Sequence, residues 1–268
     1  MEVANGVHEV DGVVGSNVIL LTGERMAVVD TGFSGNGEAI LSYIKKIGRS
    51  ADELEWIVLT HFHHDHSGSA LELHNLTGAH IVAHKAEAHN NTEGKLVLRK
   101  GDEGQVAPIW YMLGQRFARI FEARMNSIAQ NITDTPVHQT VEDGDIIPCS
   151  SGLRIIHTPG HTPGSICPIL TSPKLLFLGD SVINNINRLS RPLMWDRNKR
   201  RQLDTSLRSL RNLDAEFASF GHGPLLSQHV MDSIRLLTDR PYDLPTWRIA
   251  LKNWSTLRKF RNKLNRTE

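Results

Sequence analysis

The stretch Thr60–His66 constrains this chain more than any other, because it places four potential metal ligands within six positions. These ligands are His61, His63, Asp65 and His66. The apolar run Glu55–Leu59 comes directly before them and predicts a buried strand. A helix is expected to begin near Ser67, with this serine as a possible N-cap. We therefore expect the ligands on a tight loop that can aim several side chains at one point.

The residue types in this loop favour a transition metal. Imidazole nitrogens and carboxylate oxygens are ligands that suit zinc and related metals. Without a metal, so many polar groups in one loop would each need other partners and solvation. The alternative is a histidine-rich surface loop or a tag-like tract. It fits poorly, because the flanking segments look like a buried strand and a helix and not like low-complexity sequence.

Composition excludes several classes of protein. The chain has 268 residues, 40% of them hydrophobic and 22% charged, which is typical of a soluble globular protein with a large core. The formal net charge of +1 gives no global bias toward nucleic acid or membrane surfaces. The chain contains only Cys149 and Cys167, so we expect no disulfide framework and a cytoplasmic location. No signal peptide and no transmembrane run is expected.

Short strands alternate with helices along the chain. Strands are predicted at Val7–Val10, Asn17–Thr22, Arg25–Asp30, Ala79–Ala83, Val137–Val141, Leu153–His157, Ile166–Leu170, Lys174–Leu178 and Glu216–Phe220. Helices are predicted at Glu38–Ile47, Arg200–Leu213 and Leu225–Thr238. Residues 94–104 are expected to form a connection, and residues 184–197 an irregular loop near the mouth of the site. His80, His84 and His89 are expected at the surface or behind the site and are not predicted to be ligands.

Four further residues with metal-site chemistry stand at predicted strand ends. Asp30 ends an apolar strand, where it can cap a turn or accept a hydrogen bond from a ligand histidine, and the fragment alone leaves both open. His161 lies between two Pro-Gly turns, which hold it on a rigid loop. Asp180 follows another apolar strand. His222 has glycine on both sides, which allows close approach to a metal.

Two segments stand apart from this pattern. Residues 105–128 carry apolar residues at helical spacing with arginines between them, and predict a helix on the core or a pocket wall, lid or dimer face. Residues 246–268 carry a Trp/Leu stripe with seven basic residues and one acid. They predict a C-terminal basic amphipathic helix packed on the body. Binding to RNA, an acidic partner or a membrane surface is the alternative.

With all five motifs in this order, the sequence resembles the metallo-β-lactamase-fold hydrolase superfamily over residues 7–240. The signature of that family is a strand-end Asp, His-x-His-x-Asp-His, a lone His, a bridging Asp and a last His. The resemblance implies an α/β fold, a four-layer αβ/βα sandwich of two mixed sheets with helices outside and metals at one edge. It implies a catalytic domain over 1–240 with a helical insertion at about 105–130, followed by the C-terminal helix at 241–268.

The resemblance also implies roles for the individual residues. His61, His63 and His161 would hold a first metal, and Asp65, His66 and His222 a second. Asp180 would bridge the two metals, and Asp30 would contact a ligand from behind. Two divalent ions are implied, zinc first, with manganese or iron as alternatives. A hydroxide that bridges them would attack the substrate, and Asp65 would carry a proton to the leaving group.

Residues at which this sequence differs from particular branches of the family narrow the range of expected reactions. His63, where a di-iron flavoprotein would carry Glu, argues against that branch. Asp180 stands where many zinc β-lactamases carry Cys or Ser, and is similar to glyoxalase II, acyl-homoserine lactonases and tRNA-processing nucleases. The segment after His222 lacks the glutathione-binding residues of true glyoxalase II. We expect a hydrolase of a small ester, lactone or thioester. The alternatives are a β-lactam or phosphoester hydrolase, a mononuclear-iron persulfide dioxygenase and an RNA-processing nuclease.

The expected partner is a small-molecule substrate. No nucleic-acid partner is expected from the overall charge. A homodimer through residues 105–128 or through the tail is possible. The mononuclear dioxygenase uses fewer ligands than this chain provides, so the presence of both His66 and His222 argues against it.

Overall fold

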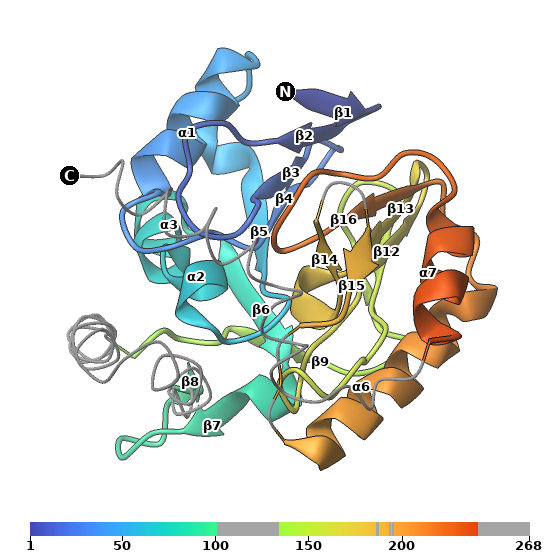
Figure 1. Cartoon of the computed structure of the whole chain (residues 1–268). Helices are drawn as coiled ribbons and strands as arrows, with labels where there is room; N and C mark the ends of the chain where they lie inside the picture. Colours follow the sequence, from blue (N-terminus) through green and yellow to red (C-terminus); the bar gives the residue numbers. More distant parts are fainter. Residues whose placement is uncertain (101–133, 186–187, 193, 195, 241–268) are drawn as a thin grey trace, which may run out of the picture.

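Two large β-sheets pack face to face in the computed structural model, with helices on both outer sides (Figure 1). The structure describes residues 1–100, 134–185, 188–192, 194 and 196–240. Within them the α/β sandwich of four layers is confirmed. The helical insertion predicted at about 105–130 and the helix predicted at 241–268 lie outside the described residues. None of the described helices combines the length and the apolar character needed to cross a membrane.

The first sheet is mixed and follows the order β1-β2-β3-β4-β5-β6-β9. Its strands are β1 Glu2–Ala4, β2 Val7–Glu9, β3 Ile19–Leu21, β4 Met26–Val29, β5 Leu54–Val58, β6 His80–His84 and β9 Gln139–Val141. The first four strands pair antiparallel, whereas β4, β5, β6 and β9 run parallel. The carboxyl ends of β4, β5 and β6 therefore meet at one edge of the sheet.

The second sheet follows the order β10-β11-β12-β13-β16. Its strands are β10 Ile146–Ile147, β11 Leu153–Arg154, β12 Ile169–Thr171, β13 Lys174–Phe177 and β16 Phe217–Ser219. Only β13 and β16 pair parallel, so their carboxyl ends also share an edge. Two small hairpins were not predicted, namely β7 Ala88–Asn90 with β8 Leu96–Leu98, and β14 Ile183–Asn184 with β15 Leu189–Ser190.

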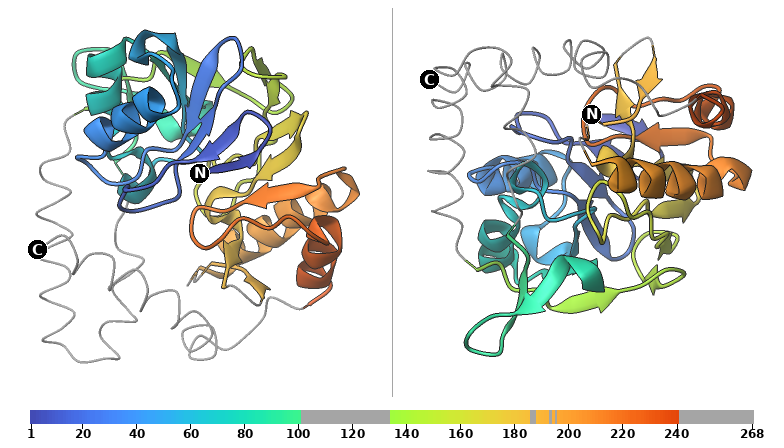
Figure 2. Two further views of the ribbon diagram at one scale, coloured as in Figure 1. Left: turned by 90° about the horizontal axis from the view of Figure 1, so that it is seen from above. Right: turned by 60° about the horizontal axis from the view of Figure 1, so that its bottom comes forward.

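Helices cover the outer face of each sheet (Figure 2). The longer ones are α1 Gly37–Lys46, α3 Ala70–Thr77, α6 Arg197–Ser209 and α7 Val230–Thr238. The 3-10 turns are η1 Ala51–Glu53, η2 Lys85–Glu87, η4 Gly179–Ser181 and η5 Leu210–Asn212. The helix predicted from Leu225 begins only at Val230, because Leu226 exchanges two backbone hydrogen bonds with Ala218 and is held extended.

Three apolar layers fill the spaces between these four layers. Along β4, Met26 and Val28 face α1 and α3, whereas Ala27 and Val29 face the second sheet. The alternation arises because successive side chains of a strand point to opposite faces. The same alternation along β13 sends Phe177 to the layer between the sheets. Each such large side chain stabilises the fold by about 1.5–3 kcal/mol through burial.

The described residues on either side of positions 101–133 lie next to each other. The backbone N–H of Leu98 donates to the carbonyl of Thr135 at 2.8 Å. The ammonium of Lys100 lies 3.0 Å from the carboxylate of Asp134. The two ends of the segment 101–133 are therefore fixed side by side, next to the hairpin of β7 and β8.

Candidate metal centre

The histidine loop follows β5, as predicted, but its second half is helical. A one-turn helix, α2, spans His64–Ser67, and α3 follows from Ala70. The helix expected after the loop is α3, but it begins at Ala70 and not near Ser67. Ser67 does not cap it, because the Ser67 hydroxyl donates back to the carbonyls of Phe62 and His63. Asp65 and His66 therefore project from a helical turn.

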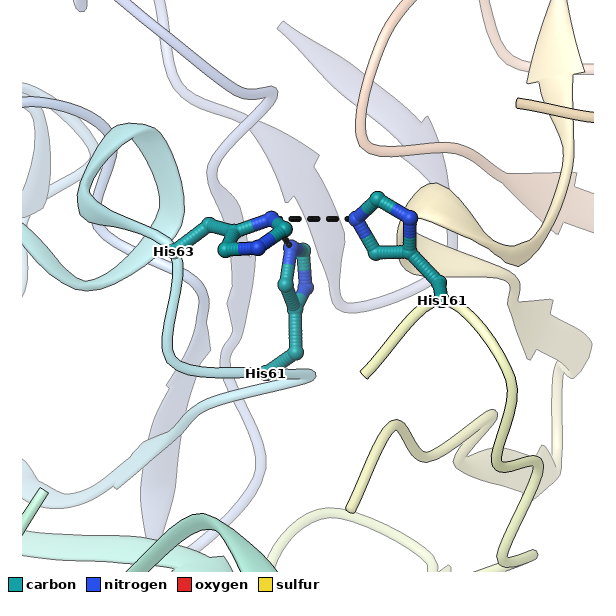
Figure 3. Close-up of side chains that lie close together, drawn as sticks. All are labelled: His61, His63 and His161. Carbon is teal, nitrogen blue, oxygen red and sulfur yellow. Dashed lines mark hydrogen bonds between the residues drawn. The ribbon is translucent and has the colours of Figure 1, made fainter. Parts of the chain in front are cut away.

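The structure brings together His61, His63 and His161 as a first group (Figure 3). The Nδ1 atom of His63 lies 3.0 Å from Nε2 of His61 and 3.0 Å from Nε2 of His161. A ring nitrogen offers either one proton or one lone pair, so Nδ1 of His63 cannot form full hydrogen bonds with both neighbours at once. Three nitrogens on a tetrahedral zinc, at Zn–N of about 2.0–2.1 Å, would lie about 3.3 Å apart. The group therefore has the spacing of a nitrogen-ligand set.

Burial keeps the histidines of this group uncharged. It lowers the pKa of His61 well below its ordinary value, with the neighbouring imidazoles acting in the same direction. It lowers the pKa of His63 to about 3 and also lowers the pKa of His161. Neutral imidazoles have a free lone pair at neutral pH, which is the form that binds a metal.

A second group consists of Asp65, His66 and His222, and comes from α2 and the loop after β16. The carboxylate of Asp65 accepts a hydrogen bond from Nε2 of His222 at 3.1 Å. Asp180 in η4 lies between the two groups. One of its oxygens is 3.3 Å from Nε2 of His66 and 3.6 Å from Nε2 of His222, and the other is 3.7 Å from Nε2 of His161.

Two buried polar atoms between the groups have no hydrogen-bond partner among the described residues. They are Nε2 of His66 and one carboxylate oxygen, Oδ1, of Asp180. Leaving such atoms unpaired costs free energy unless another charge satisfies them. Burial acts to raise the pKa of Asp180, but His222 and His66 outweigh it and hold this pKa well below its usual range. An ionised carboxylate among imidazole nitrogens fits divalent cations, so the donor set passes this test.

Asp30 lies directly behind the second group. It is 3% exposed and adopts a left-handed backbone conformation (φ 58°) at the end of β4. Its carboxylate accepts from Nδ1 of His66 at 2.7 Å and from the backbone N–H and hydroxyl of Thr60 at 2.8 Å each. The sequence left open whether Asp30 contacts a candidate ligand, and the structure shows that it contacts His66. A proton held on Nδ1 of His66 leaves Nε2 free to face the site.

Thr60 extends this support to the first group. Its hydroxyl donates to Asp30, and Nδ1 of His61 lies 3.1 Å from the same hydroxyl oxygen. Because the Thr60 hydroxyl uses its proton in the hydrogen bond to Asp30, its oxygen accepts from Nδ1–H of His61. This hydrogen bond leaves Nε2 of His61 without a proton and facing His63. The sequence analysis did not identify this role, because a threonine after a strand carries no distinctive signal.

The glycine before His222 is required by the site. A Cβ atom on Gly221 would lie 2.3 Å from Oδ1 of Asp180 and 2.5 Å from Cε1 of His66. Any side chain at this position would therefore occupy the space between the two groups. This agrees with the sequence-based interpretation that glycine here allows close approach.

Glu87, which is fully buried in η2, was not predicted as part of the site. Its carboxylate accepts hydrogen bonds from the loop of His61 and His63 and from the loop of His161. The only sequence signal is an acidic residue just after β6, a strand parallel and adjacent to β5. Without knowledge of the strand order, nothing marks this glutamate as part of the site.

The histidines that were not predicted as ligands lie outside both groups. His80 and His89 are exposed. His84 is buried and stacks on His157, with ring centroids 3.9 Å apart, and its Nδ1 accepts from the backbone N–H of Ala86. His84 thus lies behind the site, where the end of β6 packs against the segment that leads to His161.

The His84–His157 stack should make the stability of the metal-free protein depend on pH. Burial, together with His157 and Lys85, lowers the pKa of His84 to about 4. Unfolded histidine binds its proton near pH 6.5. The unfolded state therefore binds more protons between pH 6.5 and 4, and the free energy of unfolding should fall as the pH drops through this range.

Urea unfolding of the metal-free protein at pH 7 and pH 4.5 checks this prediction. His84→Gln should flatten part of the decline in the free energy of unfolding, whereas His89→Gln, at an exposed position, should leave this decline unchanged. An equally steep decline in His84→Gln and in the original chain would contradict the prediction.

The family model of the metallo-beta-lactamase superfamily matches residues 11–222 of this chain. The chain belongs to the metallo-β-lactamase superfamily. The resemblance stated from the motifs is thereby confirmed. As a member of this superfamily, the chain has its candidate ligands where the two sheets meet, on loops that follow β5, β11, β13 and β16.

Named proteins from several organisms are similar to this chain. The chain is 26% identical to the beta-lactamase-like protein 2 homolog of Caenorhabditis elegans over 81% of its length. It is 26% identical to the human acyl-coenzyme A thioesterase MBLAC2 over 62%, and 28% identical to the hydroxyacylglutathione hydrolase of Rhodospirillum rubrum over 65%. The matches cover 58%, 58% and 51% of these three proteins, respectively.

A solved structure agrees with the fold. The metallo-beta-lactamase family protein TTHA1429 from Thermus thermophilus superposes with a TM-score of 0.63 at 19% identity. The superposition covers 89% of this chain and 78% of that protein. At this identity the likeness shows the four-layer architecture of the metallo-β-lactamase superfamily alone.

Proposed function

We propose that this chain is a dinuclear metal-dependent hydrolase that cleaves a small ester, lactone or thioester, with thioesters as the first choice. One observation carries the proposal. Two groups of candidate ligands face one carboxylate, Asp180, which lies within 3.7 Å of a nitrogen from each group. The choice of thioesters is supported by relatives named as an acyl-coenzyme A thioesterase and a hydroxyacylglutathione hydrolase.

The donor atoms suggest how the metals are held. We infer that His61, His63 and His161 bind one cation and that the second group binds the other, with Asp180 shared between them. Mixed nitrogen and oxygen ligands favour zinc, with manganese or iron as alternatives. When bound, two such cations lower the pKa of a water molecule and polarise the carbonyl oxygen of the substrate.

Asp65 is the residue that can move a proton. Burial acts to raise the pKa of its carboxyl, but His66 and the hydrogen bond from His222 outweigh it and hold this pKa well below its usual range. An ionised carboxylate is a proton acceptor. We infer that Asp65 takes the proton of the attacking water and delivers it to the leaving group, the sulfur atom in a thioester.

The described cysteines do not compete for the role of nucleophile. Burial raises the pKa of the Cys149 thiol to about 12 and that of Cys167 to about 11. Both side chains are at most 1% exposed. A buried neutral thiol is a weak nucleophile, so water is the nucleophile that the proposed site requires.

Metal removal tests the proposal directly. The protein, purified without chelator or histidine tag, should contain about two zinc or manganese ions per chain by elemental analysis, as in two-metal hydrolases. It should hydrolyse thioesters in a panel that also holds lactones, carboxylic esters, phosphoesters and a β-lactam. EDTA should abolish this activity, and added zinc should restore it.

The outcomes of this experiment separate the alternatives. Chelator-insensitive hydrolysis would overturn the metal-dependent mechanism. About one iron per chain, with sulfite formed from a persulfide and no hydrolysis, would identify a mononuclear dioxygenase. Faster turnover of a lactone or a β-lactam would keep the mechanism and replace the thioester.

A further inference from the structure

We propose that Glu87 is a positioning residue that fixes the spacing of the two loops carrying His61, His63 and His161, and thereby sets the metal affinity of this group. The inference rests on the proposed metal centre. It assigns to a side chain outside both ligand groups the function of holding one of them together, and it predicts a selective effect on one of two metal ions.

The fold places Glu87 between the two loops. It ends η2, which follows β6, and β6 pairs parallel with β5. The loop with His61 and His63 leaves the carboxyl end of β5, so it begins beside Glu87. The loop with His161 belongs to the second sheet and reaches the same point from the opposite side. The glutamate side chain is 0% exposed.

The carboxylate contacts both loops next to the candidate ligands. One oxygen accepts from the backbone N–H of Phe62 at 2.8 Å, and Phe62 lies between His61 and His63. The other oxygen accepts from the hydroxyl of Thr162 at 3.0 Å and from the backbone N–H of Gly164 at 2.5 Å. Thr162 directly follows His161. Glu87 therefore links chain positions that are adjacent in sequence to all three histidines of the first group.

The second loop is shaped to receive this carboxylate. A Cβ atom on Gly164 would lie 2.6 Å from both Cγ and Oε1 of Glu87, so a residue with a side chain would collide with it. The hydroxyl of Ser165 lies 2.7 Å from the hydroxyl of Thr162, which orients Thr162 toward Glu87. A carboxylate is the acceptor-only group that suits three donors.

The second ligand group is held by different contacts. The carbonyl of Asp65 accepts from the backbone N–H of Ser16, and Asn17 donates from its backbone N–H to Gly221 and from its side chain to Phe220. Among the described residues, these contacts tie α2 to the loop of His222 without Glu87. Loss of the Glu87 carboxylate should therefore weaken one metal ion more than the other.

Titration of metal-free protein with zinc, in competition with a chromogenic chelator, tests this inference. In Glu87→Gln an amide NH₂ replaces one acceptor and faces an N–H group. We expect one of two zinc equivalents to bind about 10–100-fold more weakly, the usual effect of losing a group that orients ligands, and the other to change less than about threefold. Thr162→Val, which removes one of the three donors, should weaken the same equivalent by a smaller factor.

Glu72→Gln is the matched control. Glu72 also accepts from two backbone N–H groups and a hydroxyl, those of Gly35, Gly37 and Ser69. It links segments that carry none of the candidate ligands. All three donors contact the same oxygen, Oε2, which the amide oxygen of glutamine can replace. We expect this variant to bind both zinc equivalents as tightly as the original chain.

Other outcomes would overturn the inference. If the Glu87→Gln variant unfolds more easily but binds both zinc equivalents normally, the role of Glu87 is purely structural. Equal weakening of both equivalents would show general loosening of the fold. If Glu87→Gln does not fold, normal zinc binding by Thr162→Val would be decisive against the inference. If the original chain binds only one zinc, the dinuclear centre is wrong, and Glu87 is tested by whether its variant weakens that one ion.

Discussion

Replacing Asp180 by asparagine should lower kcat/KM for the best substrate by more than about 100-fold, beyond the effect typical of residues that only orient ligands. Asp180 faces nitrogens of His66, His161 and His222, so it touches both ligand groups. An amide keeps one neutral oxygen and turns an NH₂ group toward cations. We expect elemental analysis to show fewer than two metal ions per chain, while circular dichroism shows an unchanged fold.

His64→Ala provides the control for this variant. His64 lies within the same loop, but its ring contacts the hydroxyl of Ser34 at 3.3 Å and the ring of Phe33, and it belongs to neither ligand group. The His64→Ala variant should keep most of the activity and the full metal content of the original chain. Undiminished activity and two metal ions in Asp180→Asn would refute the shared-ligand role.

Removal of the Asp30 carboxylate should affect both stability and metal binding. In the metal-free protein, burial lowers the pKa of His66, but Asp30 and Asp180 more than compensate and hold it well above its ordinary value. Asp30→Ala leaves this buried imidazolium without its closest partner. Loss of one member of a buried ion pair typically costs about 3–5 kcal/mol, so urea should unfold the metal-free variant at much lower concentration.

Asp30→Asn separates the effect of charge from the effect of backbone shape. Asparagine tolerates the left-handed conformation seen at this residue, whereas alanine does not. We expect Asp30→Asn to lie between alanine and the original chain in stability. Its zinc affinity should fall about 10–100-fold, because the tautomer of His66 is no longer fixed. Normal zinc affinity in both variants would show that Asp30 only shapes the turn.

The candidate ligands could be predicted because their chemistry is local. Three histidines and an aspartate in one loop, and single His or Asp residues beside glycine at strand ends, are visible without knowledge of the fold. The structure brings together His161, Asp180 and His222, which are distant from the loop in sequence. The supporting residues could not be predicted in this way. Glu87 and Thr60 act only through neighbours that the sheet order supplies.

The fold shows the same division. Strands with a continuous apolar run, such as β4 and β13, were predicted almost to their ends. The hairpin of β14 and β15 was missed because its strands have two residues each and form only through pairing with each other. α2 was missed because His64–Ser67 shows no apolar face. Its helical turn is fixed by hydrogen bonds from the Ser67 hydroxyl and backbone to the preceding loop.

The paired exit and entry of the chain near Leu98 and Thr135 have a consequence for how such a protein can diversify. Because these ends already meet, the entropy of closing an inserted segment grows only with the logarithm of its length, by about 0.6 kcal/mol per doubling. Because Leu98 and Thr135 are already held together, a change in the length of the chain that joins them carries only this small entropic cost.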